Sequence, residues 1–94
     1  MDTYIIRRRS GWATEAELAE AAARSTAEGE KMSDDVRWIR SYVVSEEDGD
    51  LGTVCVYQAS SLKAIQEHAS RAGLPADEII PVGETLVVRP DPGS

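Results

Sequence analysis

The sequence has no phenylalanine, one cysteine and one histidine among its 94 residues. A single cysteine excludes an internal disulfide and is typical of a reducing compartment, so we expect a cytoplasmic protein. No apolar run approaches the ~20 residues needed to span a bilayer, and no secretory leader is visible, so no membrane partner is expected. A lone histidine also excludes a closed zinc-type site built by one chain, because such sites need several nitrogen or sulfur ligands.

Basic residues are scarce as well, with 10 Lys and Arg against 17 Asp and Glu, for a net charge of −7. This negative field repels phosphate backbones, so nucleic acid is not an expected partner. The local exception is the run Arg7, Arg8 and Arg9, which would alternate between the two faces of a strand. We expect one of these arginines to be solvated, one to pair with a carboxylate, and one to face a ligand.

The length of the chain is that of one small domain, predicted over residues 1–89 with a flexible tail at 90–94. Without phenylalanine, the core must be built from aliphatic residues and a few Tyr and Trp. Such a core is thin, so burial of a sheet face against a second copy of the chain would add stability.

Hydrophobic patterns and turn residues predict six elements in the order β-α-β-β-α-β. Thr14 and Glu17 form a capping box at the start of the first helix. Asp48-Gly49 marks a hairpin turn, and Gly73 suits the left-handed position that ends the second helix. The predicted strands are 3–8, 36–44, 51–58 and 85–89, and the predicted helices are 14–29 and 61–72.

Alternation along the second predicted strand places Trp38, Arg40 and Tyr42 on one face and Ser41 on the other. Helical spacing in the second predicted helix gives an apolar stripe. That stripe contains Leu62, Ile65, Ala69 and Ala72. His68 lies roughly 80° from its centre, which is a border position.

The element order predicts an α+β ferredoxin-like βαββαβ fold, with a four-stranded antiparallel sheet and two helices on one face. Two helices cover only one side of such a sheet. The other side carries large apolar residues, which predicts sheet-to-sheet pairing into a dimeric α+β barrel. We expect a ligand pocket beside the sheet.

Three segments carry a resemblance to a known family: WIRSYVV from Trp38, TVCVYQA from Thr53 and AIQEHASRAGLPADEI from Ala64. They resemble the domain of unknown function 4242 family, some members of which are described as nickel-binding. The resemblance implies a ferredoxin-like dimeric α+β barrel that binds a metal or small ligand near the sheet. The residues that match the family's site positions are Ser41, Tyr42, Tyr57 and His68.

Two positions depart from this family, in which the first strand and the third strand often carry carboxylates. The present chain has Arg7 and Gln58 there. Loss of two hard anionic ligands weakens a site for nickel or another divalent metal, and the added cation favours an anionic ligand.

Two functional hypotheses follow. In the first, a homodimer binds a small ligand or a metal ion such as nickel through His68, and ligand contacts are made by Tyr57, Trp38, Arg7, Ser41 and Gln58. In the alternative, a cofactor-independent isomerase, cyclase or monooxygenase uses His68 as general acid or base, with Tyr42 and Arg40 as further catalytic groups. Cys55, on a central strand without a second thiol, is expected to be an inert small hydrophobe. A purely structural dimer is the fallback.

Overall fold

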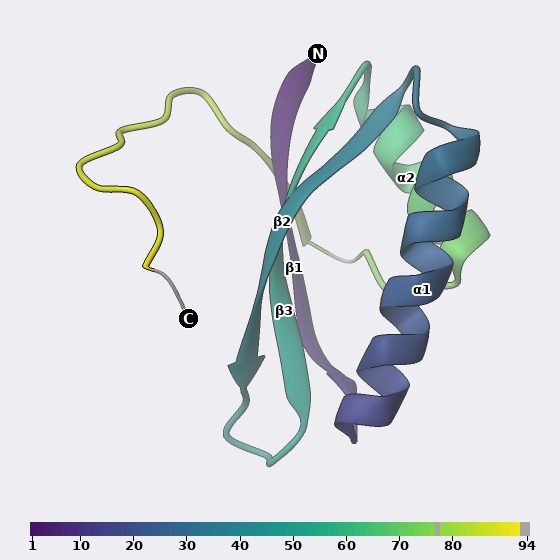
Figure 1. The fold of residues 1–94 in the computed structure, drawn as a ribbon, viewed down its shortest axis with the longest axis vertical. Helices are drawn as coiled ribbons and strands as arrows, with labels where there is room; N and C mark the ends of the chain where they lie inside the picture. Colours follow the sequence, from purple (N-terminus) through teal and green to yellow (C-terminus); the bar gives the residue numbers. More distant parts are fainter. Residues whose placement is uncertain (77, 93–94) are drawn as a thin grey trace.

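The computed structural model of the chain describes residues 1–76 and 78–92. Its sheet is antiparallel with the strand order β2-β3-β1-β4, and both helices lie on one side of it (Figure 1). The elements are β1 Asp2–Trp12, α1 Glu15–Lys31, β2 Val36–Ser45, β3 Leu51–Ala59, α2 Leu62–Ala72 and β4 Glu78–Pro81. The predicted ferredoxin-like α+β fold is therefore confirmed.

The start of α1 and the end of α2 agree with the prediction, whereas α1 continues to Lys31, past its predicted end at residue 29. The Thr14 hydroxyl accepts from Glu17 N at 3.2 Å, and the Glu17 carboxylate accepts from Ala13 N at 2.9 Å. At the end of α2, Gly73 takes a left-handed φ of 67°, and Leu74 N donates to the Ala69 carbonyl at 2.9 Å. These bonds satisfy backbone groups that a helix end leaves free, so local sequence sets both boundaries.

The fourth strand was predicted in the wrong place. It is not Thr85–Arg89 but Glu78–Pro81, which pairs with β1 and sets Ile79 opposite Ile6. Both segments have β-forming residues, so propensity alone does not choose between them. Ile79 packs against the core, whereas Leu86, Val87 and Val88 are 84, 76 and 88% exposed. Contact with the core decides which segment joins the sheet.

A β-bulge in β2 overturns the predicted division of its faces. Trp38 pairs with Tyr57 and Arg40 pairs with the next residue, Val56, so Ile39 is an extra residue in the ladder. An extra residue shifts all later side chains to the opposite face. Trp38 therefore lies on the helix-covered side, whereas Arg40 lies on the helix-free side.

β1 is also longer than predicted, because Ser10-Gly11 disturbs the strand without ending it. The register with β3 shifts between Arg8 and Trp12, and Ser10 has a φ of 47°. The irregularity turns the end of β1 so that Trp12 is again buried.

The buried stripe of α2 differs from the prediction by part of a turn. His68, predicted at the border, is 1% exposed, whereas Leu62 is 44% exposed. The stripe is centred on Ile65 and His68, and it packs on a core made by both helices and the sheet. Its buried members are Ala64, Ile65, His68, Ala69 and Ala72.

The C-terminal segment arches out on the side of the sheet that carries no helix (Figure 1). Within the tail predicted at 90–94, the Asp91 carboxylate pairs with Arg40 and accepts from the Tyr42 hydroxyl at 2.8 Å. Residues 93 and 94 lie outside the described residues. Among the helices that the structure describes, none has the length and apolar character to cross a membrane.

Candidate functional site

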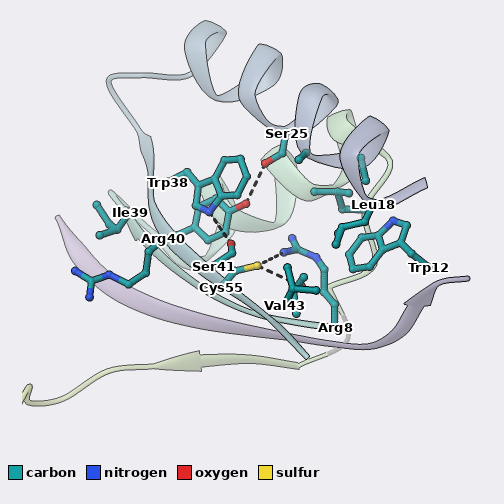
Figure 2. Close-up of a pocket in the computed structure, with 15 residues that line it drawn as sticks. Arg8, Trp12, Leu18, Ser25, Trp38, Ile39, Arg40, Ser41, Val43 and Cys55 are labelled. Carbon is teal, nitrogen blue, oxygen red and sulfur yellow. Dashed lines mark hydrogen bonds between the residues drawn. The ribbon is translucent and has the colours of Figure 1, made fainter. Parts of the chain in front are cut away.

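A cavity of about 450 Å³ lies between α1 and the helix-covered side of the sheet (Figure 2). Small side chains create it, because α1 buries only Ala21 and Ser25. Its walls are largely apolar, as is usual for small-molecule sites of this size. The apolar lining comprises Trp12, Leu18, Ala21, Ala22, Trp38, Ile39, Val43 and Leu74.

Arg8 is the charged group inside this site. Arg8 lies on the same face of β1 as the buried residues Tyr4 and Ile6, and it is itself only 2% exposed. Its Nε donates to the Pro75 carbonyl at 2.6 Å, and its Nη1 donates to Cys55 Sγ at 3.2 Å. Its Nη2 is buried and has no hydrogen-bond partner among the described residues. The guanidinium therefore has unused donor capacity beside the cavity.

The three consecutive arginines differ in how their charge is balanced. Arg7 pairs with Glu46 at 2.8 Å, and Arg9 pairs with Glu78 at 2.9 Å. Hydrogen bonding to these two arginines lowers the pKa of the Glu46 carboxyl and that of the Glu78 carboxyl. Arg8, the most buried of the three, has no carboxylate partner within residues 1–76 and 78–92. A buried unpaired cation is costly, so this charge marks the cavity as a place for an anion.

A column of polar side chains runs from one wall of the cavity into the core. The Tyr57 hydroxyl and Ser25 Oγ are 3.0 Å apart, and burial raises the pKa of the Tyr57 hydroxyl above 10. His68 Nε2 lies 3.0 Å from the Ser25 carbonyl, which can only accept, so Nε2 carries the hydrogen. The ring centroids of Tyr57 and His68 are 5.5 Å apart. His68 thus supports Tyr57 from behind and does not line the cavity.

Trp38 forms the opposite rim. Its ring stacks on that of Tyr57, with centroids 6.2 Å apart, and its Nε1 donates to Ser41 Oγ at 2.8 Å. The bulge at Ile39 makes this arrangement possible, because it returns Ser41 to the side on which Trp38 lies.

The structure divides the eight predicted site residues into two groups. Trp38, Ser41 and Tyr57 line the cavity, and His68 lies directly behind Tyr57. The other four, Arg7, Arg40, Tyr42 and Gln58, direct their side chains to the helix-free side of the sheet. Arg40 touches the cavity rim only near its backbone, and Figure 2 shows its guanidinium pointing away.

Sequence reasoning missed Arg8, Trp12 and Thr53, all of which line the cavity. A signal for Arg8 was present, because a period of two along β1 places it on the same face as Tyr4 and Ile6. Cys55, predicted to be an inert hydrophobe, is buried as expected but also lines the cavity and accepts from Arg8.

The described residues do not fit a resident metal. No group of three or more His, Cys, Asp or Glu side chains comes together within residues 1–76 and 78–92. The proposed ligand His68 is buried and uses its Nε2 for the Ser25 carbonyl. Octahedral nickel would require further oxygen or nitrogen ligands around it.

The fold and the cavity together define a small ferredoxin-like α+β protein with a ligand-sized site between helix and sheet. Comparison with known proteins then gives its family. A family model described as "Nickel responsive protein SCO4226-like" matches residues 4–82, so the chain belongs to the SCO4226-like family. The domain of unknown function 4242 resemblance is compatible with this family, although that label itself stays a prediction.

A solved structure agrees with the fold. The crystal structure of SCO4226 from Streptomyces coelicolor A3(2) matches with a TM-score of 0.69 at 21% identity. The match covers 89% of this chain and 99% of that chain. No curated protein matches the chain.

Proposed function

We propose that this protein binds a small organic molecule in the cavity between α1 and the sheet. The observation that carries the proposal is an apolar space of about 450 Å³ beside a buried, incompletely bonded guanidinium. Apolar walls with a few convergent polar groups are the usual composition of a small-molecule site. In this site the polar groups include those of Arg8, Ser25, Ser41, Thr53 and Tyr57.

Binding is favoured over catalysis by the chemistry of the lining. Among the described residues that line the cavity there is no carboxylate and no imidazole. General acid–base catalysis needs a group that titrates near the operating pH within reach of the substrate. The enzyme hypothesis relies on His68, which Tyr57 and Ser25 separate from the cavity.

The test fills the cavity from its helix wall. Ala22 is half-buried and lines the cavity, whereas its neighbour Ala23 is exposed and does not, so Ala22→Trp and Ala23→Trp form a matched pair. A panel of small aromatic and aliphatic compounds is screened by thermal melting. At a ligand concentration of about 100 Kd, binding adds roughly 2.7 kcal/mol to stability. We expect shifts for the wild type and Ala23→Trp but none for Ala22→Trp; equal shifts in all three would place binding elsewhere.

The family description connects the chain with nickel, and we propose that any nickel response acts through a ligand set other than His68 alone. The placement of His68 in the core supports this version. Titration of nickel into the wild type and into His68→Gln distinguishes a site that uses His68 from one that does not.

We further propose that the chain forms a homodimer through the helix-free side of its sheet. Ile80 and Tyr42 on that side are 49 and 44% exposed, and Ile5, Val54 and Val56 are only half-buried. These apolar side chains lie among the polar ones of Arg7, Arg40 and Gln58, and exposed apolar residues rimmed by polar ones mark an interaction site. Its occupant is a second copy, because pairing of two such faces covers both at once and leaves each cavity on the outside, under its own helices.

Analytical ultracentrifugation tests the dimer. Val56→Arg places a charge at the centre of the helix-free side, and Ala27→Glu places one on the exposed surface of α1. The wild type and Ala27→Glu should sediment at twice the 10.2 kDa chain mass, and Val56→Arg at the mass of one chain. A monomeric wild type at 100 µM would refute the proposal.

A further inference from the structure

We infer that the ligand of the cavity is an organic monocarboxylate, whose carboxylate pairs with Arg8 and whose apolar body lies between α1 and the sheet. This inference rests on the proposed function, because it names the ligand class of the same site. Three features support it: the free edge of the guanidinium, the shape of the walls, and the balance of charge.

The charge comes first. Arg7 and Arg9 each have a carboxylate partner, whereas Arg8 has none in the part of the chain that the structure describes. A guanidinium presents a planar fork that matches the two oxygens of a carboxylate. Nε is held by the Pro75 carbonyl and one Nη1 hydrogen by Cys55 Sγ, so the second Nη1 hydrogen and Nη2 form the edge that a ligand can use.

The walls describe the rest of the molecule. Figure 2 shows the Arg8 guanidinium between the Trp38 side of the cavity and the Leu18 and Trp12 side. The stacked rings of Trp38 and Tyr57 offer a flat apolar surface, and α1 adds only small or aliphatic side chains. A flat aromatic or short aliphatic body would be covered on both sides.

The balance of charge favours a carboxylate over a phosphate. A phosphate group carries about −1.5 to −2 charges at neutral pH, whereas a carboxylate carries one. The Arg8 guanidinium balances a single negative charge, and the hydroxyls that line the cavity add donors but no charge. Because Nη2 is shielded in this structure, pairing requires a small movement of the side chains around it.

The experiment compares phenylacetate with phenylacetamide, which has nearly the same shape but no charge. Calorimetric titration gives both dissociation constants at pH 7 for the wild type, Arg8→Met, Arg8→Lys and Ala22→Trp. Tryptophan fluorescence locates binding, because both tryptophans of the chain, Trp12 and Trp38, line the cavity. Inorganic phosphate is titrated as a second anion, and Asp77→Asn tests whether a carboxylate of the chain itself competes for Arg8.

We expect the wild type to bind phenylacetate at least about 10-fold more tightly than phenylacetamide, in keeping with a charge-assisted pair to a buried guanidinium. Arg8→Met should bind both equally, Arg8→Lys should keep part of the preference, and Asp77→Asn should bind like the wild type. Equal affinities in the wild type would overturn the carboxylate inference and leave cavity binding intact. Tighter binding of phosphate, or carboxylate binding seen only in Asp77→Asn, would also overturn it. Failure of both compounds to bind, together with no shift in the wider panel, would remove the proposed function as well.

Discussion

Replacement of Arg8 by methionine should make this protein more stable, although it removes the most buried charge in the cavity. Methionine is similar in length to the arginine stem, so it can occupy the same space without a charge. Desolvation of a buried guanidinium costs several kcal/mol. The structure shows how little of that cost is recovered within the described part of the chain.

The compensating contacts are few. The bond from Arg8 Nε to the Pro75 carbonyl contributes about 1.5–3 kcal/mol as a charged hydrogen bond. The guanidinium carbon lies 6.0 Å from the Tyr57 ring centroid, at the outer limit of a cation–π contact. Cys55 is a weak acceptor, and Nη2 has no hydrogen-bond partner within residues 1–76 and 78–92. Pro75 is exposed, so its carbonyl can bond to water once Arg8 is gone. We therefore expect Arg8→Met to gain roughly 1–3 kcal/mol.

Urea denaturation followed by tryptophan fluorescence measures the change, and thermal melting should show a rise of about 4 °C or more for a domain of this size. The neighbouring arginines are matched controls. Arg7→Met breaks the half-buried pair with Glu46 and should lower the melting temperature, whereas Arg9→Met, in an exposed pair, should change it little.

The refuting result is a loss of more than about 1 kcal/mol in Arg8→Met, since removal of one member of a buried ion pair is strongly destabilising. Such a loss would mean that an internal carboxylate balances Arg8. A gain, in contrast, would identify a residue kept for binding at the expense of stability.

Three further predictions concern other parts of the molecule. Gly52→Ala should lower the free energy of unfolding by about 1–3 kcal/mol in urea denaturation, because an added Cβ would lie 2.6 Å from the Arg8 carbonyl oxygen and closer still to the Glu46 carboxylate. A variant as stable as the wild type would mean that the hairpin moves aside without cost. His68→Ala should lose about 2–4 kcal/mol by leaving a void in the core and removing the hydrogen bond to the Ser25 carbonyl. Calorimetry should give the same nickel isotherm for His68→Gln as for the wild type, and a nickel signal lost in His68→Gln would establish His68 as a ligand. The pKa of the Glu46 carboxyl is lowered from 4.5 by hydrogen bonds from Arg7 and Ser10. Its contribution to the free energy of unfolding is therefore complete above pH 4.5 and disappears as the pH falls through the lowered folded-state pKa. Urea midpoints measured between pH 7 and 3 should fall less steeply with pH for Glu46→Gln than for the wild type, and an identical fall in both would contradict the pairing.

The sequence alone determined the order of elements, the ferredoxin-like fold, the start of α1 and the end of α2, because these depend on local chemistry. A capping hydroxyl at Thr14 or a left-handed glycine at Gly73 acts within a few residues of its position in the chain. The hairpin turn at Gly49, with a φ of 91°, is of the same kind.

Tertiary structure decided which side of the sheet each candidate faces and which segment completes it. The bulge at Ile39 separates Trp38 from Arg40 and Tyr42, and a strand pattern read with strict period two does not reveal such an insertion. Glu78–Pro81 pairs with the free edge of β1 in place of Thr85–Arg89, because Ile79 of the first segment packs against the core and the apolar residues of the second do not. The cavity is likewise a property of packing, because the small side chains of α1 leave space between the helix and the sheet beside Arg8. Alternation along β1 places Arg8 on the buried face, but only the tertiary structure shows that Glu46 pairs with Arg7 and Glu78 with Arg9.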